Sequence, residues 1–249
     1  TEEIALGTIV GSNISNIALI FGVSLIGYST AISPSSKRNF IALSLSVLVA
    51  IYALSDLIIS KLDSLMLLAV LAYFIYIMAI QPNNNELTVE QNDSSYLNLS
   101  IFLIIGLLSI TIGSNYAVIN GEKIALIIGI PKLIIGLTVL AIGTSLPELA
   151  VTISALMKQK NQMVLGNIIG SNVLNIAVVM PILGLFSTKT FDPSIITRDM
   201  TVMTILSLIF VIIALSFNYK NIPINVYRLI GIILVSSYII YIGILGGLL

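Results

Sequence analysis

Glu148 is a carboxylate in the middle of a long apolar run, "VLAIGTSLPELAV" at residues 139–151. At helical spacing Ala141, Ser145 and Glu148 share one face, and Thr144 stands four residues before Glu148. Their hydroxyl, carbonyl and carboxylate oxygens would converge on one point. An all-oxygen set without sulfur or imidazole suits a hard cation, Ca²⁺ or Na⁺, rather than Zn²⁺ or Cu²⁺. We therefore predict a cation site around Glu148.

Pro147 directly precedes this glutamate. Proline has no N–H, and its ring clashes with the carbonyl four residues back, here that of Gly143. We expect the helix to break or kink between about Gly143 and Pro147 and to free carbonyl oxygens, which in lipid need a partner, a cavity or an ion. An alternative is a capping box, in which Ser145 and Glu148 only satisfy the start of a second half-helix. The two roles can coexist.

A second polar pattern, Gly-Ser-Asn-x-x-Asn, occurs twice in the chain. Ser12 and Asn16 are four residues apart, as are Ser171 and Asn175, so each pair lies on one face of its helix. A hydroxyl and an amide at the same place in both copies favour a role in the ion site. The glycines in the two copies form Gly-x-x-x-Gly patterns, which instead favour close helix packing.

The chain that carries these residues has the composition of a polytopic membrane protein. Of its 249 residues 57% are hydrophobic and 9% charged, whereas a soluble domain is about a quarter charged. Its net charge of zero gives no indication of nucleic-acid binding. Without cysteine or histidine, the chain cannot use thiolate or imidazole chemistry.

Eight apolar stretches are long enough to cross a bilayer, and Gly121–Pro131 could either extend the fourth or belong to a connection. Only Asp56 and Glu148 put a charge inside these stretches, and Asp56 is interpreted as a solvated acid near the membrane surface. The expected spans are Ile4–Tyr28, Phe40–Ile59, Ser64–Ile80, Asn98–Tyr116, Leu133–Met157, Gln162–Phe186, Met200–Phe217 and Leu229–Leu248.

The two polar patterns belong to an internal repeat. A shift of 159 residues places "LGTIVGSNISNIA" (6–18) on "LGNIIGSNVLNIA" (165–177), with nine of thirteen positions identical. The matching spans are five crossings apart, so they run in opposite directions and the halves form an inverted repeat, an architecture of secondary transporters. We predict an all-α membrane bundle with a first repeat at 1–80, a polar linker at 81–97 and a second repeat at 98–249.

These segments resemble a known family. "GTSLPEL" at 143–149 followed by "GNIIGSNVLNI" at 166–176 is similar to the second α-repeat of the sodium/calcium exchangers, within the cation/Ca²⁺ antiporter superfamily. "GTIVGSNISNI" at 7–17 resembles the latter part of the first α-repeat. Family members have ten spans. The resemblance therefore implies that this chain lacks the first two, with a second glutamate expected about a dozen residues before Thr1.

The resemblance also implies roles for individual residues. Glu148 would ligate both Ca²⁺ and Na⁺, joined by Thr144 and the carbonyl of Ala141, and Ser171 would complete a Na⁺ site. Ser145 would line the same pocket, while Ser12 and Asn16 would serve the symmetry-related side. Asn175 departs from some microbial exchangers, which have an aspartate there, and Thr8 stands where the second repeat has Asn167. Both departures bear on ion selectivity.

The implied activity is exchange of Na⁺ for Ca²⁺ by alternating access, with the two ions as transported partners and no cofactor. The alternative is a H⁺/Ca²⁺, or other cation, antiporter in which Glu148 carries the proton. A channel and an intramembrane enzyme are less favoured, and an enzyme is not expected because the chain offers no His, Cys or paired membrane aspartates. The expected location is the plasma membrane of a prokaryote.

Overall fold

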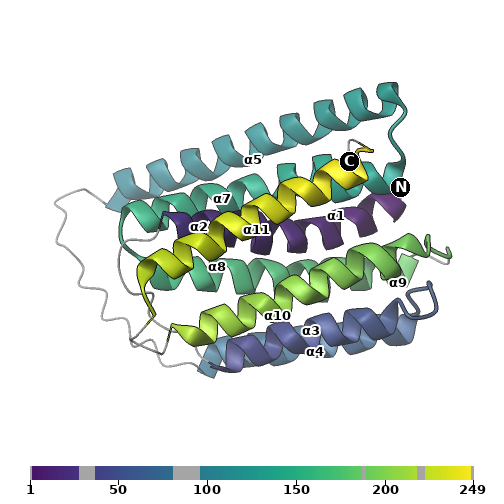
Figure 1. Ribbon diagram of the computed structural model, residues 1–249, viewed down its shortest axis with the longest axis horizontal. Helices are drawn as coiled ribbons and strands as arrows, with labels where there is room; N and C mark the ends of the chain where they lie inside the picture. Colours follow the sequence, from purple (N-terminus) through teal and green to yellow (C-terminus); the bar gives the residue numbers. More distant parts are fainter. Residues whose placement is uncertain (1, 28–36, 81–95, 187–188, 218–221, 248–249) are drawn as a thin grey trace.

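Long apolar helices make up the structure, a computed structural model that describes residues 2–27, 37–80, 96–186, 189–217 and 222–247 (Figure 1). Within these ranges seven helices are long and apolar enough to cross a membrane, and α3 (Lys37–Ala53) adds a shorter apolar one. No strand occurs in the described part of the chain. The prediction of an all-α membrane bundle with about eight spans is therefore confirmed, and the protein is a multi-pass integral membrane protein.

Several spans combine α-helix with a short π-helical segment. The first joins α1 (Glu2–Ser15), η1 (Asn16–Phe21) and α2 (Gly22–Ile26), and is followed by α3 and α4 (Lys61–Ile80). The second half begins with α5 (Tyr96–Ile128), followed by a helix made of α6 (Lys132–Ile135), η2 (Gly136–Leu140) and α7 (Ala141–Met157). The remaining spans are α8 (Asn161–Leu174) with η3 (Asn175–Val179) and α9 (Met180–Phe186), η4 (Ile195–Met200) with α10 (Thr201–Ser216), and α11 (Ile224–Leu245).

Of the break or kink expected between Gly143 and Pro147, the break is wrong. The α-helix α7 runs through Pro147 without interruption, and the irregular segment is η2, which ends at Leu140. Membrane helices tolerate an internal proline because neighbouring helices and local π adjustments satisfy the backbone groups that the proline frees. The ambiguous segment after residue 121 is also settled, since α5 continues as one helix to Ile128.

The π segments follow the internal repeat. Both η1 and η3 begin at an asparagine of the Gly-Ser-Asn-x-x-Asn pattern, Asn16 and Asn175. Such wide turns occur often at functional sites. Figure 1 shows that α1 and α8 run in opposite directions, as the inverted repeat requires.

The centre of the bundle is the contact of α1 with η2, α7 and α8. Gly7 and Gly11 allow this contact: a Cβ on Gly11 would lie 2.6 Å from the Leu137 carbonyl oxygen and 2.7 Å from the Ala141 Cβ. Around this centre the halves interleave, because α11 packs against α2 and η1 while α4 packs against α9. Apart from a smaller contact with α6, α5 is held through η2 and α7 and leaves most of its surface exposed.

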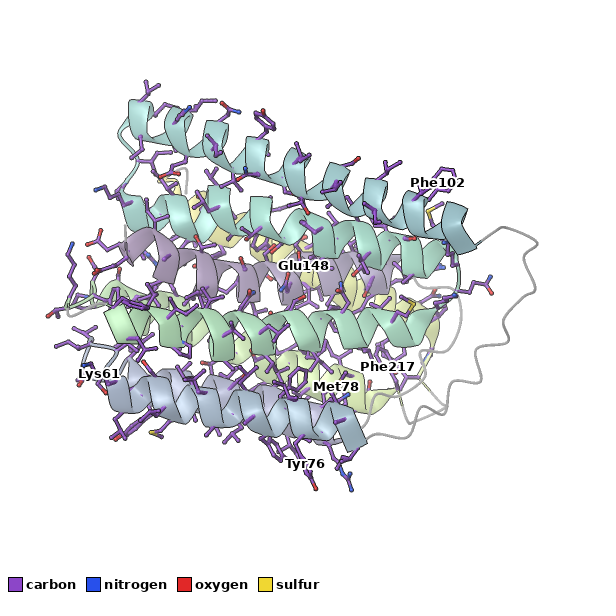
Figure 2. All side chains as sticks on the ribbon, turned by 180° about the vertical axis from the view of Figure 1, so that it is seen from behind. Lys61, Tyr76, Met78, Phe102, Glu148 and Phe217 are labelled. Carbon is purple, nitrogen blue, oxygen red and sulfur yellow. The ribbon has the colours of Figure 1, made fainter. Side chains whose placement is uncertain are left out.

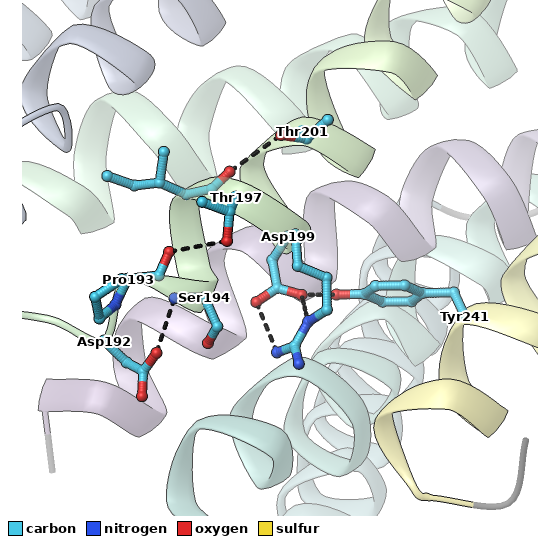
Figure 3. A network of polar contacts seen from close by, with 9 residues as sticks. Asp192, Pro193, Ser194, Thr197, Asp199, Thr201 and Tyr241 are labelled. Carbon is cyan, nitrogen blue, oxygen red and sulfur yellow. Dashed lines mark hydrogen bonds and ion pairs between the residues drawn. The ribbon is translucent and has the colours of Figure 1, made fainter.

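A buried charge network ties η4 to α11 (Figure 3). Asp199 is completely buried and receives two bonds from Arg198, at 2.8 Å from Nε and 3.0 Å from Nη2. The Tyr241 hydroxyl donates a third, at 2.8 Å. Both charged residues lie inside the candidate span Ile195–Ser216, which begins five residues before the expected start at Met200. Asp56 lies in the exposed turn after α3, where it accepts a bond from the Ile58 amide.

Candidate cation site

The predicted site residues meet where α1, η1, α7 and α8 pack together, near the middle of their spans. Figure 2 shows Glu148 at the centre of the bundle, far from either end. The predicted polar side chains therefore come from three spans, those of α1, α7 and α8, and lie near the middle of each. Two neighbouring groups of oxygens result.

The first group consists of neutral oxygens from α1 and α7. The hydroxyls of Ser12 and Thr144 lie 2.9 Å apart. Ser12 Oγ is 3.5 Å from the Ala141 carbonyl oxygen, and Thr144 Oγ1 is 3.2 Å from the same oxygen and 2.9 Å from that of Leu140. Each hydroxyl has one proton and two lone pairs, so the group keeps acceptor capacity in excess of its donors. It can serve a monovalent cation.

The second group contains the carboxylate. Glu148 Oε1 accepts a bond from Ser171 Oγ at 3.4 Å, whereas Oε2 is buried and has no hydrogen-bond partner in the described structure. The same holds for Asn16 Oδ1 and Ser145 Oγ. A buried polar atom without a partner is costly, and a carboxylate oxygen especially so. Three such oxygens on adjoining helices are therefore suited to a cation.

An amide pair fixes the orientation of Asn16. Its Nδ2 donates to Asn172 Oδ1 at 3.2 Å across the crossing of the two repeats, which leaves Asn16 Oδ1 without a partner. Asn172, which is fully buried, is not among the predicted site residues. The repeat could have indicated it, because the two spans carry the same Gly-Ser-Asn-x-x-Asn in opposite directions and can bring amides of the two copies together where they cross.

A further amide holds α8 against α7 beside the proline. Asn167 Nδ2 donates to the Glu148 carbonyl at 3.1 Å and to Thr152 Oγ1 at 3.2 Å. Thr8, its repeat counterpart, instead donates to the Ile4 carbonyl of its own helix. In the sequence Asn167 is notable only as a difference between the repeats, and no local pattern predicts that it joins α8 to α7.

The predicted residues are thus brought together to different degrees. Ser12, Ala141 and Thr144 form one contact group, and Glu148 contacts Ser171. Asn175 opens η3 and is half-buried, but its side chain makes no hydrogen bond within the described residues. Among those residues no cluster of three or more His, Cys, Asp or Glu exists, and Glu148 is the one acid among the predicted site residues.

The glycine faces of the two repeats differ. On α1, Gly7 and Gly11 are covered by the helix that carries Glu148. At their counterparts on α8, Gly166 and Gly170, an added Cβ would meet nothing within 4 Å. One side of the pseudo-symmetric site is therefore packed and the other is open in the described structure.

Comparison with known proteins gives concordant results. A family model described as "Sodium/calcium exchanger protein" matches residues 2–80 and 98–247. The chain is 34% identical to "Inner membrane protein YrbG" of Escherichia coli (strain K12) over 98% of its length and 77% of that protein. It is 30% identical to "Putative antiporter CaxA" of Alkalimonas amylolytica, over 96% of this chain and 77% of that protein. The solved sodium/calcium exchanger from Methanococcus jannaschii superimposes with a TM-score of 0.70 at 31% identity, over 96% of this chain and 75% of that one.

Proposed function

This chain belongs to the sodium/calcium exchanger family, a family of cation/Ca²⁺ antiporters rather than enzymes, and we propose that it exchanges Na⁺ for Ca²⁺ by alternating access. Its location as a plasma-membrane protein of a prokaryote is part of the same proposal. The relatives named above come from bacteria and an archaeon, and one is an inner-membrane protein.

The observation that carries the proposal is the unpaired Glu148 Oε2, buried like Asn16 Oδ1 and Ser145 Oγ on helices that pack together, α7 and η1. A Ca²⁺ ion takes six to eight oxygen ligands, and charged, amide and hydroxyl oxygens all suit it. We assign Glu148 as the ligand that Ca²⁺ and Na⁺ share. Because the two ions share Glu148, the site cannot neutralise both of them together, so binding of one disfavours the other, which is the basis of exchange.

The neutral group favours Na⁺ over H⁺ as the coupling ion. A proton on Glu148 would need no further ligand and would leave the oxygens of Ser12, Thr144 and Ala141 without a role. A sodium ion, by contrast, uses several neutral oxygens at once. We place Na⁺ at this group, and a second Na⁺ position near Ser171, with the amide of Asn175 on the same side.

A transport assay separates the two coupling ions. The full-length protein would be reconstituted in vesicles, and uptake of radioactive Ca²⁺ measured with an outward Na⁺ gradient, with a pH gradient alone, or with neither. We expect uptake with the Na⁺ gradient only. Uptake driven by the pH gradient alone would favour the proton antiporter, and uptake without any counter-ion would indicate a channel.

A paired variant tests the assignment of the neutral group. Replacing Ser12 by Ala together with Thr144 by Val removes both hydroxyls and keeps Glu148. Uptake driven by Na⁺ should fall at least about tenfold, since two ligand contacts of about 1 kcal/mol each are lost. Unchanged Na⁺-driven uptake would contradict the assignment.

The open face of α8 suggests that the site is completed by a further helix. By the repeat symmetry, Gly166 and Gly170 would receive the first-repeat counterpart of the helix Lys132–Met157, within two halves at 1–80 and 98–249 joined by the linker 81–97. In the structure an added Cβ at position 166 would meet nothing within 4 Å, so Gly166→Leu tests this directly. We expect exchange to be lost, while Gly113→Leu on α5, which is also open, retains it. Full activity of Gly166→Leu would exclude a helix at this face.

A further inference from the structure

A cavity of about 380 Å³ lies between α5 and α7, apart from the cation site. Phe102, Gly106 and Ile110 of α5 form one wall, and Ala150 and Ser154 of α7 belong to the other. Its size falls within the roughly 300–1,000 Å³ of small-molecule sites. Because both walls belong to membrane-spanning helices and are largely apolar, an aliphatic chain suits the cavity better than water.

The cavity exists because α5 and α7 do not remain in contact along their length. At Gly121 and Gly143 they approach closely: a Cβ on either residue would lie 2.5 Å from a valine methyl group, of Val139 and Val118 respectively. At Gly106 an added Cβ would meet nothing within 4 Å. Gly106 therefore leaves space between the helices.

Two lysines stand at the mouth of this cavity. The end of α7 is a Schellman turn, in which the Lys160 amide donates to the Ala155 carbonyl at 2.8 Å and that of Gln159 to Leu156 at 3.0 Å. Gln159 takes the left-handed φ of 56° that this turn requires. The turn places Lys158 and Lys160 on either side of one residue, and both are exposed and line the cavity. Neither forms a salt bridge within the described structure.

The charged side chains that the structure describes at this end of the bundle have one sign. The described charged side chains here, where α7 ends and where α3, α5 and α11 begin, are all cationic: Arg38, Lys158, Lys160 and Arg228. Lysines beside an acyl-chain cavity at the membrane surface attract anionic headgroups, at about 1 kcal/mol for each Lys.

We propose that the α5–α7 cavity binds an anionic glycerophospholipid, with one acyl chain between Gly106 and Ser154 and the phosphate at Lys158 and Lys160. The chain supplies apolar surface where α5 lacks contact with α7. The phosphodiester carries one negative charge, which offsets part of the positive charge of the two lysines. A zwitterionic lipid offers the same chain without the net charge.

Quenching of a single tryptophan tests the site in the full-length protein. The chain has no tryptophan, so Phe102→Trp places a reporter on the cavity wall. Tyr76→Trp is the matched control, because Tyr76 is 60% exposed near the same membrane end but on the far side of the bundle (Figure 2). The protein would be reconstituted in phosphatidylcholine vesicles with rising fractions of phosphatidylglycerol or phosphatidylcholine brominated in the acyl chains.

At Phe102→Trp we expect phosphatidylglycerol to bind about 30-fold more strongly than phosphatidylcholine, which is about 2 kcal/mol at 1.4 kcal/mol per tenfold. Tyr76→Trp should show no preference. Lys158→Gln with Lys160→Gln should abolish the preference, and Gly106→Leu, which fills the cavity, should remove the site for both lipids. Equal quenching by the two lipids at Phe102→Trp would overturn the proposal. So would a preference that survives the lysine changes, or one that survives Gly106→Leu. If another helix filled the cavity, or if acidic residues of the polar linker bound the two lysines, the two lipids would quench Phe102→Trp equally.

Discussion

Replacing Glu148 by glutamine removes the one charge that the predicted site residues of this chain bring to the cation site, and it keeps the shape of the side chain. Two unit charges 4 Å apart interact by about 4 kcal/mol at an effective dielectric constant of about 20. The variant should therefore lose about 4 kcal/mol for Na⁺ and, because the charge is doubled, about 8 kcal/mol for Ca²⁺. At 1.4 kcal/mol per tenfold, affinity falls about 10³-fold for Na⁺ and at least about 10⁵-fold for Ca²⁺.

Stability should change in the opposite direction. Glu148 Oε2 is buried without a partner, so the ion-free protein carries an unsatisfied charged oxygen. Glutamine replaces it with a neutral amide, and we expect the free energy of unfolding in ion-free buffer to rise by about 1–3 kcal/mol. The two measurements are vesicle Ca²⁺ uptake and thermal unfolding with and without added Ca²⁺.

The matched control is Glu122→Gln, since Glu122 lies on α5 near the end of the bundle, away from the cation site. It should retain both uptake and the rise in melting temperature that Ca²⁺ produces. The reasoning would be refuted if Glu148→Gln kept either property, or if it unfolded at a lower temperature than the parent protein without ions.

Three further changes test other parts of the structure. Asn175→Asp adds a second carboxylate near Ser171 and should tighten Ca²⁺ binding at least about tenfold, measured by calorimetry; unchanged affinity would place Asn175 outside the site. Tyr241→Phe removes a bond to the buried Asp199 and should cost about 1.5–3 kcal/mol in thermal unfolding, whereas the exposed Tyr76→Phe should cost nothing measurable. Gly11→Ala forces a methyl group against the Leu137 carbonyl and should destabilise by about 1–3 kcal/mol, whereas Gly113→Ala, in open space, should not; equal stabilities would contradict the close contact of α1 with η2 and α7.

Much of the fold follows from patterns within the chain. Hydrophobic length predicts the spans, and the 159-residue repeat predicts their directions. Spacing along single helices predicts that Ala141 and Thr144 lie near Glu148. The repeat adds Ser12 and Ser171, which come from other helices and contact Thr144 and Glu148 respectively.

The features that the sequence did not predict depend on contacts between distant residues. Counted as charges, Arg198 and Asp199 placed the start of the expected span after them, at Met200. In the structure the two form an ion pair, and Asp199 also accepts a bond from Tyr241, 42 residues away in the sequence. A π turn differs from an α turn by one residue, and no local pattern distinguishes the two. The continuity of α7 through Pro147 likewise cannot be read from the local sequence, which contains the usual helix breaker.

The wide turn at η1 sets the phase of the first span. In a regular α-helix Gly11 and Gly22, eleven residues apart, would point in nearly the same direction, since eleven residues make roughly three turns. The extra residue of a π turn sets the later face back by about 100°. Gly11 can therefore face η2 and α7 while Gly22 faces α11. A single span thus packs against two partners that lie in different directions around its axis. Deleting a single residue between Asn16 and Phe21 would restore ordinary pitch and leave Gly22 facing Gly231, since ten residues of α-helix turn through the same angle as eleven with one π turn.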